Sequence, residues 1–185
     1  MEEDLIKSLC GIVGEENVKS DIVDRYCYSM DASLYSSIPD VVVFPQTTDH
    51  VSEIMKFANT NEIPVTPRGA ATGLCGGAVP LKGGIVIDLS KMNKILEIDL
   101  DNFCVKVEPG VIQNELNQVL NKRGFFFPPT PGSKKMCTIG GMISTNAGGM
   151  TAVKYGVTRN FVPVSYTHLR AHETPEHLVC RLLLE

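Results

Sequence analysis

The sequence PRGAATGLCGG, at residues 67–77, decides the fold of this chain. Glycine lets a backbone turn tightly and direct several N–H groups toward one anion, so this loop indicates a phosphate-bearing ligand. A Rossmann loop opens directly into a helix, and a P-loop ends in Gly-Lys-Ser or Gly-Lys-Thr. Here AVP at residues 78–80 leads into another apolar run. The loop therefore excludes both folds, although by itself it is equally typical of an ordinary turn.

A second glycine-rich stretch, TIGGMISTNAGG at residues 138–149, strengthens the ligand interpretation. Two such segments in one compact domain predict two walls of a site for a large phosphate-bearing cofactor. We interpret this cofactor as a flavin dinucleotide.

Apolar patterns on both sides of the first loop predict a strand, helix, strand unit. Residues 40–45, DVVVFP, are a β-branched run that ends at a proline, as expected for a buried strand. Apolar side chains recur at helical spacing between residues 48 and 58. Residues 63–67 and 84–89 are predicted to be short strands before and after the loop.

The rest of the chain adds antiparallel and helical elements. Residues 95–98 and 104–107 predict a hairpin across a polar turn, and residues 112–120 predict a helix. Residues 4–9 and 18–24 have helical spacing and predict a short helical pair. The combination favours the α+β class over a doubly wound sheet.

Composition excludes several classes of function. A net charge of -4 without a dense lysine or arginine run argues against nucleic acid as a partner. No apolar run is long enough for an integral membrane segment, and the acidic start MEED lacks a secretory pattern, which predicts a cytoplasmic protein. Six cysteines lie without a C-x-x-C pair, so we expect neither a metal site nor a disulfide framework.

Five segments in fixed order resemble a known family. They are PDVVVFP at residues 39–45, residues 66–80 around the first loop, VEPGV at 107–111, residues 138–149, and VKYG at 153–156. In this order the chain resembles FAD-linked oxidases whose FAD domain is of the vanillyl-alcohol oxidase and p-cresol methylhydroxylase (PCMH) type. It is most similar to the branch of glycolate oxidase FAD subunits and D-lactate dehydrogenases.

The resemblance implies an α+β FAD-binding domain of the PCMH type, made of two α+β subdomains with FAD between them. It divides the chain into an N-terminal helical segment at residues 1–34, the FAD-binding domain at 35–162, and a segment at 163–185. The last segment resembles translated vector sequence, so we expect a truncated domain with a foreign tail. A rival interpretation of the tail is a metal site made by His168, His172, Glu173 and His177.

The resemblance also implies the cofactor contacts. The first loop would surround the FAD pyrophosphate with its backbone, and the Thr72 hydroxyl would add a hydrogen bond. The second segment would approach the flavin and ribityl end. The implied contacts are Arg68, Gly69, Ala70, Ala71, Thr72, Gly73, Leu74, Pro131, Gly132, Ser133, Thr138, Ile139, Gly140, Gly141, Ser144 and Asn146.

Three residues depart from the family pattern. Ala71 stands where glycine is common, and a backbone with positive φ there would cost about 1 kcal/mol. Thr130 replaces a common aspartate, and Met142 replaces a common asparagine. These departures predict weaker cofactor binding rather than a different fold.

The implied activity is oxidation of a 2-hydroxy acid such as D-lactate or glycolate by hydride transfer to FAD. Electrons would then pass to an acceptor such as an electron-transfer protein or a quinone. The catalytic residues would lie in the missing C-terminal region and stay unknown. Two alternatives remain open: an inactive, truncated FAD-binding module, or an FAD-fold, NADPH-dependent reductase of a cell-wall nucleotide precursor.

Overall fold

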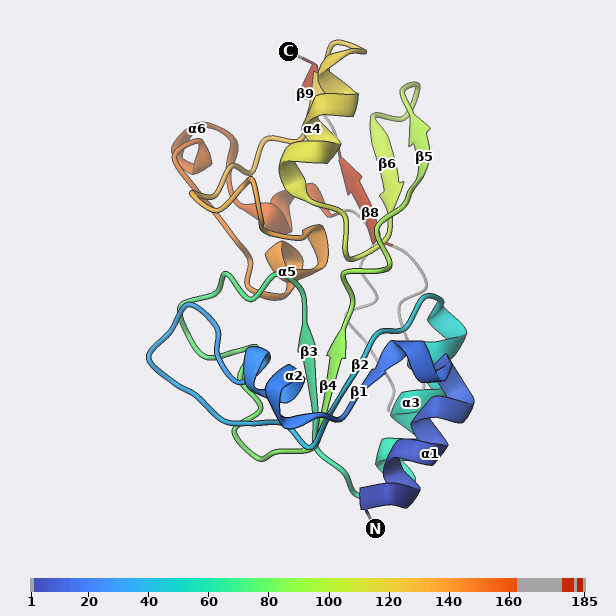
Figure 1. Cartoon of the computed structure of the whole chain (residues 1–185). Coiled ribbons are helices and arrows are strands. Elements are labelled where there is room, and N and C mark those ends of the chain that lie inside the picture. The colour runs from blue at the N-terminus through green and yellow to red at the C-terminus, as the bar shows by residue number, and fades with distance from the viewer. Residues whose placement is uncertain (1, 163–177, 182, 185) are drawn as a thin grey trace. The chain divides into compact units, whose positions relative to one another are not determined.

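A computed structural model describes residues 2–162, 178–181 and 183–184 (Figure 1). The histidines of the rival metal interpretation lie outside these residues. The chain divides into two compact units at Lys91 and Met92, and each unit has its own core. Each unit combines helices with strands, which confirms the α+β class.

The first unit is built on a four-stranded sheet in the order β1-β2-β4-β3. Strands β2 and β3 both run parallel to β4, and β1 pairs antiparallel with β2. The apolar runs of β2 and β4 are buried along their whole length, as expected for central strands of a parallel arrangement. The strands are β1, Val18–Lys19; β2, Val41–Val43; β3, Val65–Arg68; and β4, Ile85–Asp88.

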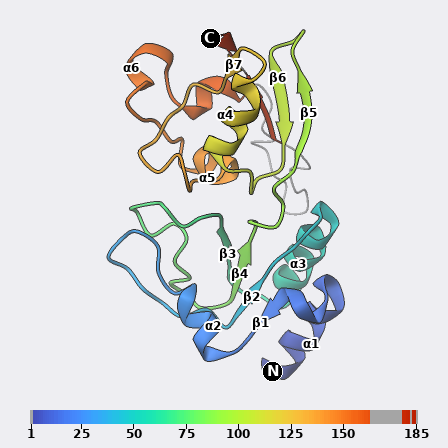
Figure 2. The ribbon, with the colours of Figure 1, turned by 45° about the horizontal axis from the view of Figure 1, so that its top comes forward.

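Two amphipathic helices, α1 (Glu2–Val13) and α3 (Thr48–Thr60), lie on one side of this sheet, while α2 (Ile22–Cys27) lies on the other (Figure 2). Helix α3 begins after Thr47, whose hydroxyl accepts a hydrogen bond from the His50 N–H at 3.2 Å. A short 3₁₀ turn, η1 (Glu15–Asn17), precedes β1. The buried core consists of Leu9, Val13, Val41, Val43, Ile54, Ala58, Ile85 and Ile87.

The helix predicted over residues 18–24 is wrong at its start. Val18 and Lys19 are paired with Val43 and Val42, so they form strand β1. Val18 packs against the core while Lys19 is exposed, which is the alternation of an edge strand. Helix α2 begins only at Ile22, after an Asp21 cap.

The second unit contains the predicted hairpin, β5 (Ile95–Asp99) and β6 (Cys104–Val107), and a third antiparallel strand, β8 (Leu178–Arg181). A second small pair joins β7 (Phe125–Phe126) to β9 (Leu183–Leu184). Strands β8 and β9 come from the segment predicted to be a foreign tail. Strand pairing uses backbone groups, which every sequence has. The pairing of β8 and β9 is therefore compatible with a native or a foreign origin of that segment.

The helices of the second unit pack around a single core. Leu116 and Leu120 of helix α4 (Gln113–Asn121) are fully buried with Phe127 and Ile139. The predicted helix over residues 112–120 is thus confirmed to within one residue. The remaining helices are short: α5, Ile139–Ser144; α6, Ala152–Tyr155; and the 3₁₀ turn η2, Thr158–Phe161. In the described part of the chain, no helix is long and apolar enough to cross a membrane.

Candidate functional site

The first glycine-rich loop connects the carboxyl end of β3 to the neighbouring parallel strand β4. Among the described residues, no acceptor bonds to any of the nine backbone N–H groups from Gly69 to Gly77. The segment carries no carboxylate, and its side chains are small or exposed. Consecutive unpaired N–H groups in an irregular turn are a common binding arrangement for phosphate oxygens.

Ala71 has a left-handed backbone with φ of 51°. The sequence had marked this position as one where a glycine would be easier to accommodate, and the backbone confirms the reason. Its carbonyl oxygen accepts a hydrogen bond from the Ala32 N–H at 3.2 Å, so the strained residue is held in place by a segment outside the loop.

We expect Ala71→Gly to raise the free energy of unfolding by about 0.5 kcal/mol. Removing the side chain relieves a strain of about 1 kcal/mol, and part of this gain is offset by the greater backbone entropy of glycine when unfolded. Urea denaturation followed by circular dichroism measures the change. Ala70→Gly is the matched control, because Ala70 has no positive φ and its replacement should lower stability instead. Equal losses in both variants would contradict the strain assigned to Ala71.

The side chain of Arg68 supports the loop from its first residue. Its Nη1 donates to the carbonyl oxygens of Met30 at 2.9 Å, Ala78 at 3.3 Å and Tyr28 at 3.4 Å. The guanidinium also lies over the Tyr28 ring, 5.1 Å from its centroid. Burial lowers the pKa of Arg68, and the negative charge of Asp88 opposes that shift. Arg68 therefore brings a fixed positive charge to the start of the loop.

The second glycine-rich segment folds into the short helix α5. Thr138 caps it, with its hydroxyl accepting from the Gly141 N–H at 3.2 Å. The Ile139 and Gly140 N–H groups donate to Val111 O and Pro109 O at 2.8 and 2.9 Å. Ile139 and Gly140 thus hold α5 against the turn that precedes α4, while Thr138 and Gly141 close its first turn. Their contact with a cofactor stays a prediction.

The predicted contacts Pro131, Gly132 and Ser133 lie in a loop that α4 holds at its ends. Gln113 donates from Nε2 to Pro129 O at 2.9 Å and from its backbone to Cys137 O at 3.1 Å. Gln113 is 1% exposed, and its Oε1 has no hydrogen-bond partner among the described residues. Sequence analysis missed this residue, although a polar side chain in line with the apolar positions 116 and 120 was a possible signal.

The remaining predicted contacts bond within their own unit. Ser144 donates to Gly140 O at 3.0 Å, and the Asn146 side chain accepts from the Arg159 N–H at 3.0 Å. Of the departures from the family pattern, Thr130 donates to Pro128 O at 2.9 Å. Met142, which stands where the family pattern commonly has asparagine, is 1% exposed and belongs to the core of the second unit. This departure therefore affects core packing.

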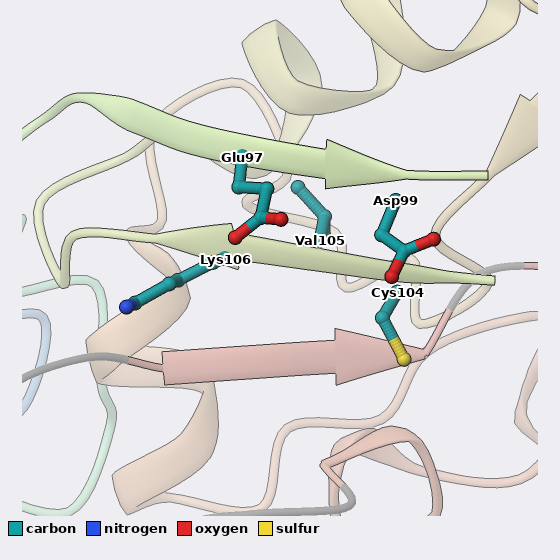
Figure 3. Close-up of a pocket in the computed structure, with 5 residues that line it drawn as sticks. All are labelled: Glu97, Asp99, Cys104, Val105 and Lys106. Atoms are coloured by element: carbon teal, nitrogen blue, oxygen red, sulfur yellow. The ribbon is translucent and has the colours of Figure 1, made fainter. Parts of the chain in front are cut away.

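A separate small hollow lies on the β5–β6 hairpin (Figure 3). It encloses about 140 Å³ and is lined by Glu97, Asp99, Cys104, Val105 and Lys106. Figure 3 shows the two carboxylates reaching over β6. The hollow contains none of the predicted cofactor contacts, and its volume is much smaller than the several hundred cubic ångströms of most cofactor pockets. Within the described ranges, no three His, Cys, Asp or Glu side chains are grouped to hold a metal ion.

Comparison with known proteins identifies the family. Residues 39–165 match the family model described as FAD binding domain. The chain belongs to this FAD-binding domain family. The match includes both glycine-rich segments, and the family's cofactor is FAD.

Two curated relatives of this FAD-binding domain are named as oxidoreductases of hydroxy acids. It is 42% identical over 161 residues to glycolate oxidase subunit GlcD of Bacillus subtilis (strain 168), covering 86% of the chain and 34% of the relative. It is 53% identical over 145 residues to a D-lactate dehydrogenase of Anaerostipes hadrus, covering 78% and 30%. The chain thus spans about a third of the length of these relatives.

A solved structure confirms the expected fold type. p-Cresol methylhydroxylase with substrate bound superimposes with a TM-score of 0.81 at 18% identity, covering 99% of this chain and 43% of that one. At this identity the likeness shows the fold alone, and the fold is the PCMH type that the sequence predicted.

The residues present are compatible with the FAD diphosphate. The first loop offers unpaired N–H groups, a nearby guanidinium and no negative side chain between residues 69 and 77. Within the described ranges the Thr72 hydroxyl makes no hydrogen bond, and its role as an additional donor to the diphosphate stays a prediction.

Proposed function

We propose that this chain is the FAD-binding part of an oxidoreductase that oxidises a small 2-hydroxy acid such as D-lactate or glycolate. The observation that carries the proposal is the loop at residues 69–77, with nine backbone N–H groups that bond to no described acceptor. The names of the two relatives support the substrate class. The rest of such a protein would supply the groups that bind the acid and remove its proton.

The proposed role of each segment follows from its chemistry. The backbone of residues 68–74 would bind the diphosphate, because N–H dipoles and the charge of Arg68 stabilise phosphate oxygens. Residues 131–133, with Thr138, Ile139, Gly140, Gly141, Ser144 and Asn146, would bind the flavin and ribityl portion. Bound FAD would supply the acceptor for the hydride from the substrate carbon. The electrons then pass to a separate acceptor, either an electron-transfer protein or a quinone.

The test begins with cofactor retention by the 185-residue chain. The chain is purified with excess FAD, free ligand is removed, and the visible flavin spectrum of the protein fraction is recorded. We expect retained flavin, and a folded but colourless protein would contradict the proposed site.

Substrate class is tested in the same preparation and in a longer protein that contains this domain. D-lactate, glycolate and NADPH are each added without oxygen, and bleaching of the flavin band is followed. We expect a hydroxy acid to bleach the longer protein and the chain alone to stay oxidised. Bleaching by NADPH and by neither acid would contradict the proposal and favour the reductase alternative.

A further inference from the structure

Residues 28–33 bond to the first glycine-rich loop at three places. Arg68 donates to the carbonyl oxygens of Tyr28 and Met30, at the start of the loop. The Ala32 N–H donates to Ala71 O at 3.2 Å, in its middle. The Ala78 N–H donates to Asp31 Oδ2 at 3.4 Å, at its end. Residues 28–33 precede the part of the chain that matches the family model, which begins at residue 39.

Asp31 is the central residue of this arrangement. Its Oδ1 accepts from the Ser33 N–H at 2.8 Å, while Oδ2 faces Ala78. Burial opposes ionisation, but hydrogen bonds from Ser33 and Ala78 and the charge of Arg68 outweigh it, so the pKa of Asp31 lies below its ordinary value. Asp31 is therefore ionised at neutral pH, and its charge in turn favours the cationic form of Arg68.

The loop itself has few bonds that would fix its shape. Its Gly76 O accepts from the Val79 N–H at 3.1 Å, but none of its N–H groups from Gly69 to Gly77 bonds to a described acceptor. Glycine at four of these nine positions adds conformational freedom. The shape of residues 69–75 therefore depends on bonds from outside this stretch, and Arg68, Ala32 and Asp31 supply them.

We propose that Asp31 is a positioning residue for the diphosphate of FAD. Through the Ala78 N–H and Arg68, it holds residues 69–77 in the shape that receives the anion before the ligand binds. The inference rests on the proposed function, which assigns the diphosphate to this loop. Asp31 itself touches no ligand in this account, because its own carboxylate would repel phosphate oxygens.

The test compares Asp31→Asn with the unchanged 185-residue chain. The amide keeps one acceptor oxygen but turns an NH₂ group toward one of the two backbone donors, so one bond is lost. If the receptive population falls to about a tenth, the apparent dissociation constant of FAD rises about tenfold. Quenching of flavin fluorescence in a titration measures this constant.

A second measurement needs no cofactor. In the FAD-free chain, ¹⁵N relaxation reports the order parameters of the amides at residues 69–77. We expect values typical of a rigid backbone, about 0.85, in the unchanged chain and below about 0.6 in Asp31→Asn. A residue that merely stabilised the fold would lower the melting temperature without this local change.

Asp99→Asn is the matched control. The Asp99 carboxylate also accepts two hydrogen bonds, from Asn102 N at 3.0 Å and Asn102 Nδ2 at 2.7 Å, but it lies at the end of β5 in the second unit. Its replacement should leave both the loop order parameters and the affinity for FAD unchanged. If Asp31→Asn fails to fold, Asp31→Glu replaces it. Because glutamate retains the charge, the dissociation constant of FAD should then rise, but by less than tenfold over that of the unchanged chain.

The outcomes separate the inference from the function on which it rests. Unchanged loop order and unchanged FAD affinity in Asp31→Asn would overturn the positioning role while leaving the cofactor site intact. If the unchanged chain bound no FAD, the proposed function would fail, and with it the diphosphate role of Asp31. If residues 69–77 lost order in Asp31→Asn although the unchanged chain bound no FAD, Asp31 would shape the backbone of the loop without any role in cofactor binding.

Discussion

Gly73→Val should abolish flavin retention while leaving the fold intact. A Cβ at Gly73 would meet no other atom within 4 Å, and its backbone lies outside the left-handed region, so the substitution has little structural cost. Its methyl groups would occupy the space beside the loop N–H groups where phosphate oxygens must approach. We expect the dissociation constant of FAD to rise about 100-fold, which corresponds to about 2.7 kcal/mol.

Gly11→Val provides a matched control outside the loop. Gly11 lies in helix α1, and like Gly73 it has open space around its Cβ position and no positive φ. Its replacement should leave FAD affinity unchanged. Equilibrium titration with FAD, together with thermal unfolding of both FAD-free variants, measures the contrast. Unchanged FAD affinity in Gly73→Val would contradict the assignment of the diphosphate to this loop.

Gly149→Ala should destabilise the second unit by about 3 kcal/mol or more. A Cβ there would lie 1.9 Å from Thr130 O and 2.8 Å from Pro131 N, and the glycine has φ of 154°. Both neighbours are backbone atoms, so the two segments must separate. Because Pro131 begins the predicted flavin contacts, FAD affinity should fall together with stability. Urea denaturation measures the first effect and flavin titration the second.

Gly132→Ala is the control for Gly149→Ala. A Cβ at Gly132 would meet nothing within 4 Å, and Gly132 has no positive φ, so the unfolding midpoint should stay near that of the unchanged chain. An unchanged midpoint in Gly149→Ala would show that residues 130 and 149 do not lie as close as the structure places them.

Local patterns predicted the elements whose burial follows a simple period. The strands β2 and β4 contain continuous apolar runs at residues 41–43 and 85–87, and α3 and α4 have apolar stripes, so each was found near its true limits. Strand β1 was mistaken for a helix because two residues carry too little periodicity to distinguish the two. Helix α5 was not predicted, since its glycines disfavour helix; a Thr138 cap and the burial of Ile139 and Met142 stabilise it.

By itself, the sequence determined the family, the α+β class and the loop at residues 67–77, because strand runs and glycine spacing are local properties. It also identified Ala71 as a strained position. Only the tertiary structure decided that β4 lies between β2 and β3, and that Asp31, Ala32 and Gln113 hold the two predicted binding segments. Their hydrogen-bond partners are distant in sequence, and no local pattern specifies which backbone groups folding brings together.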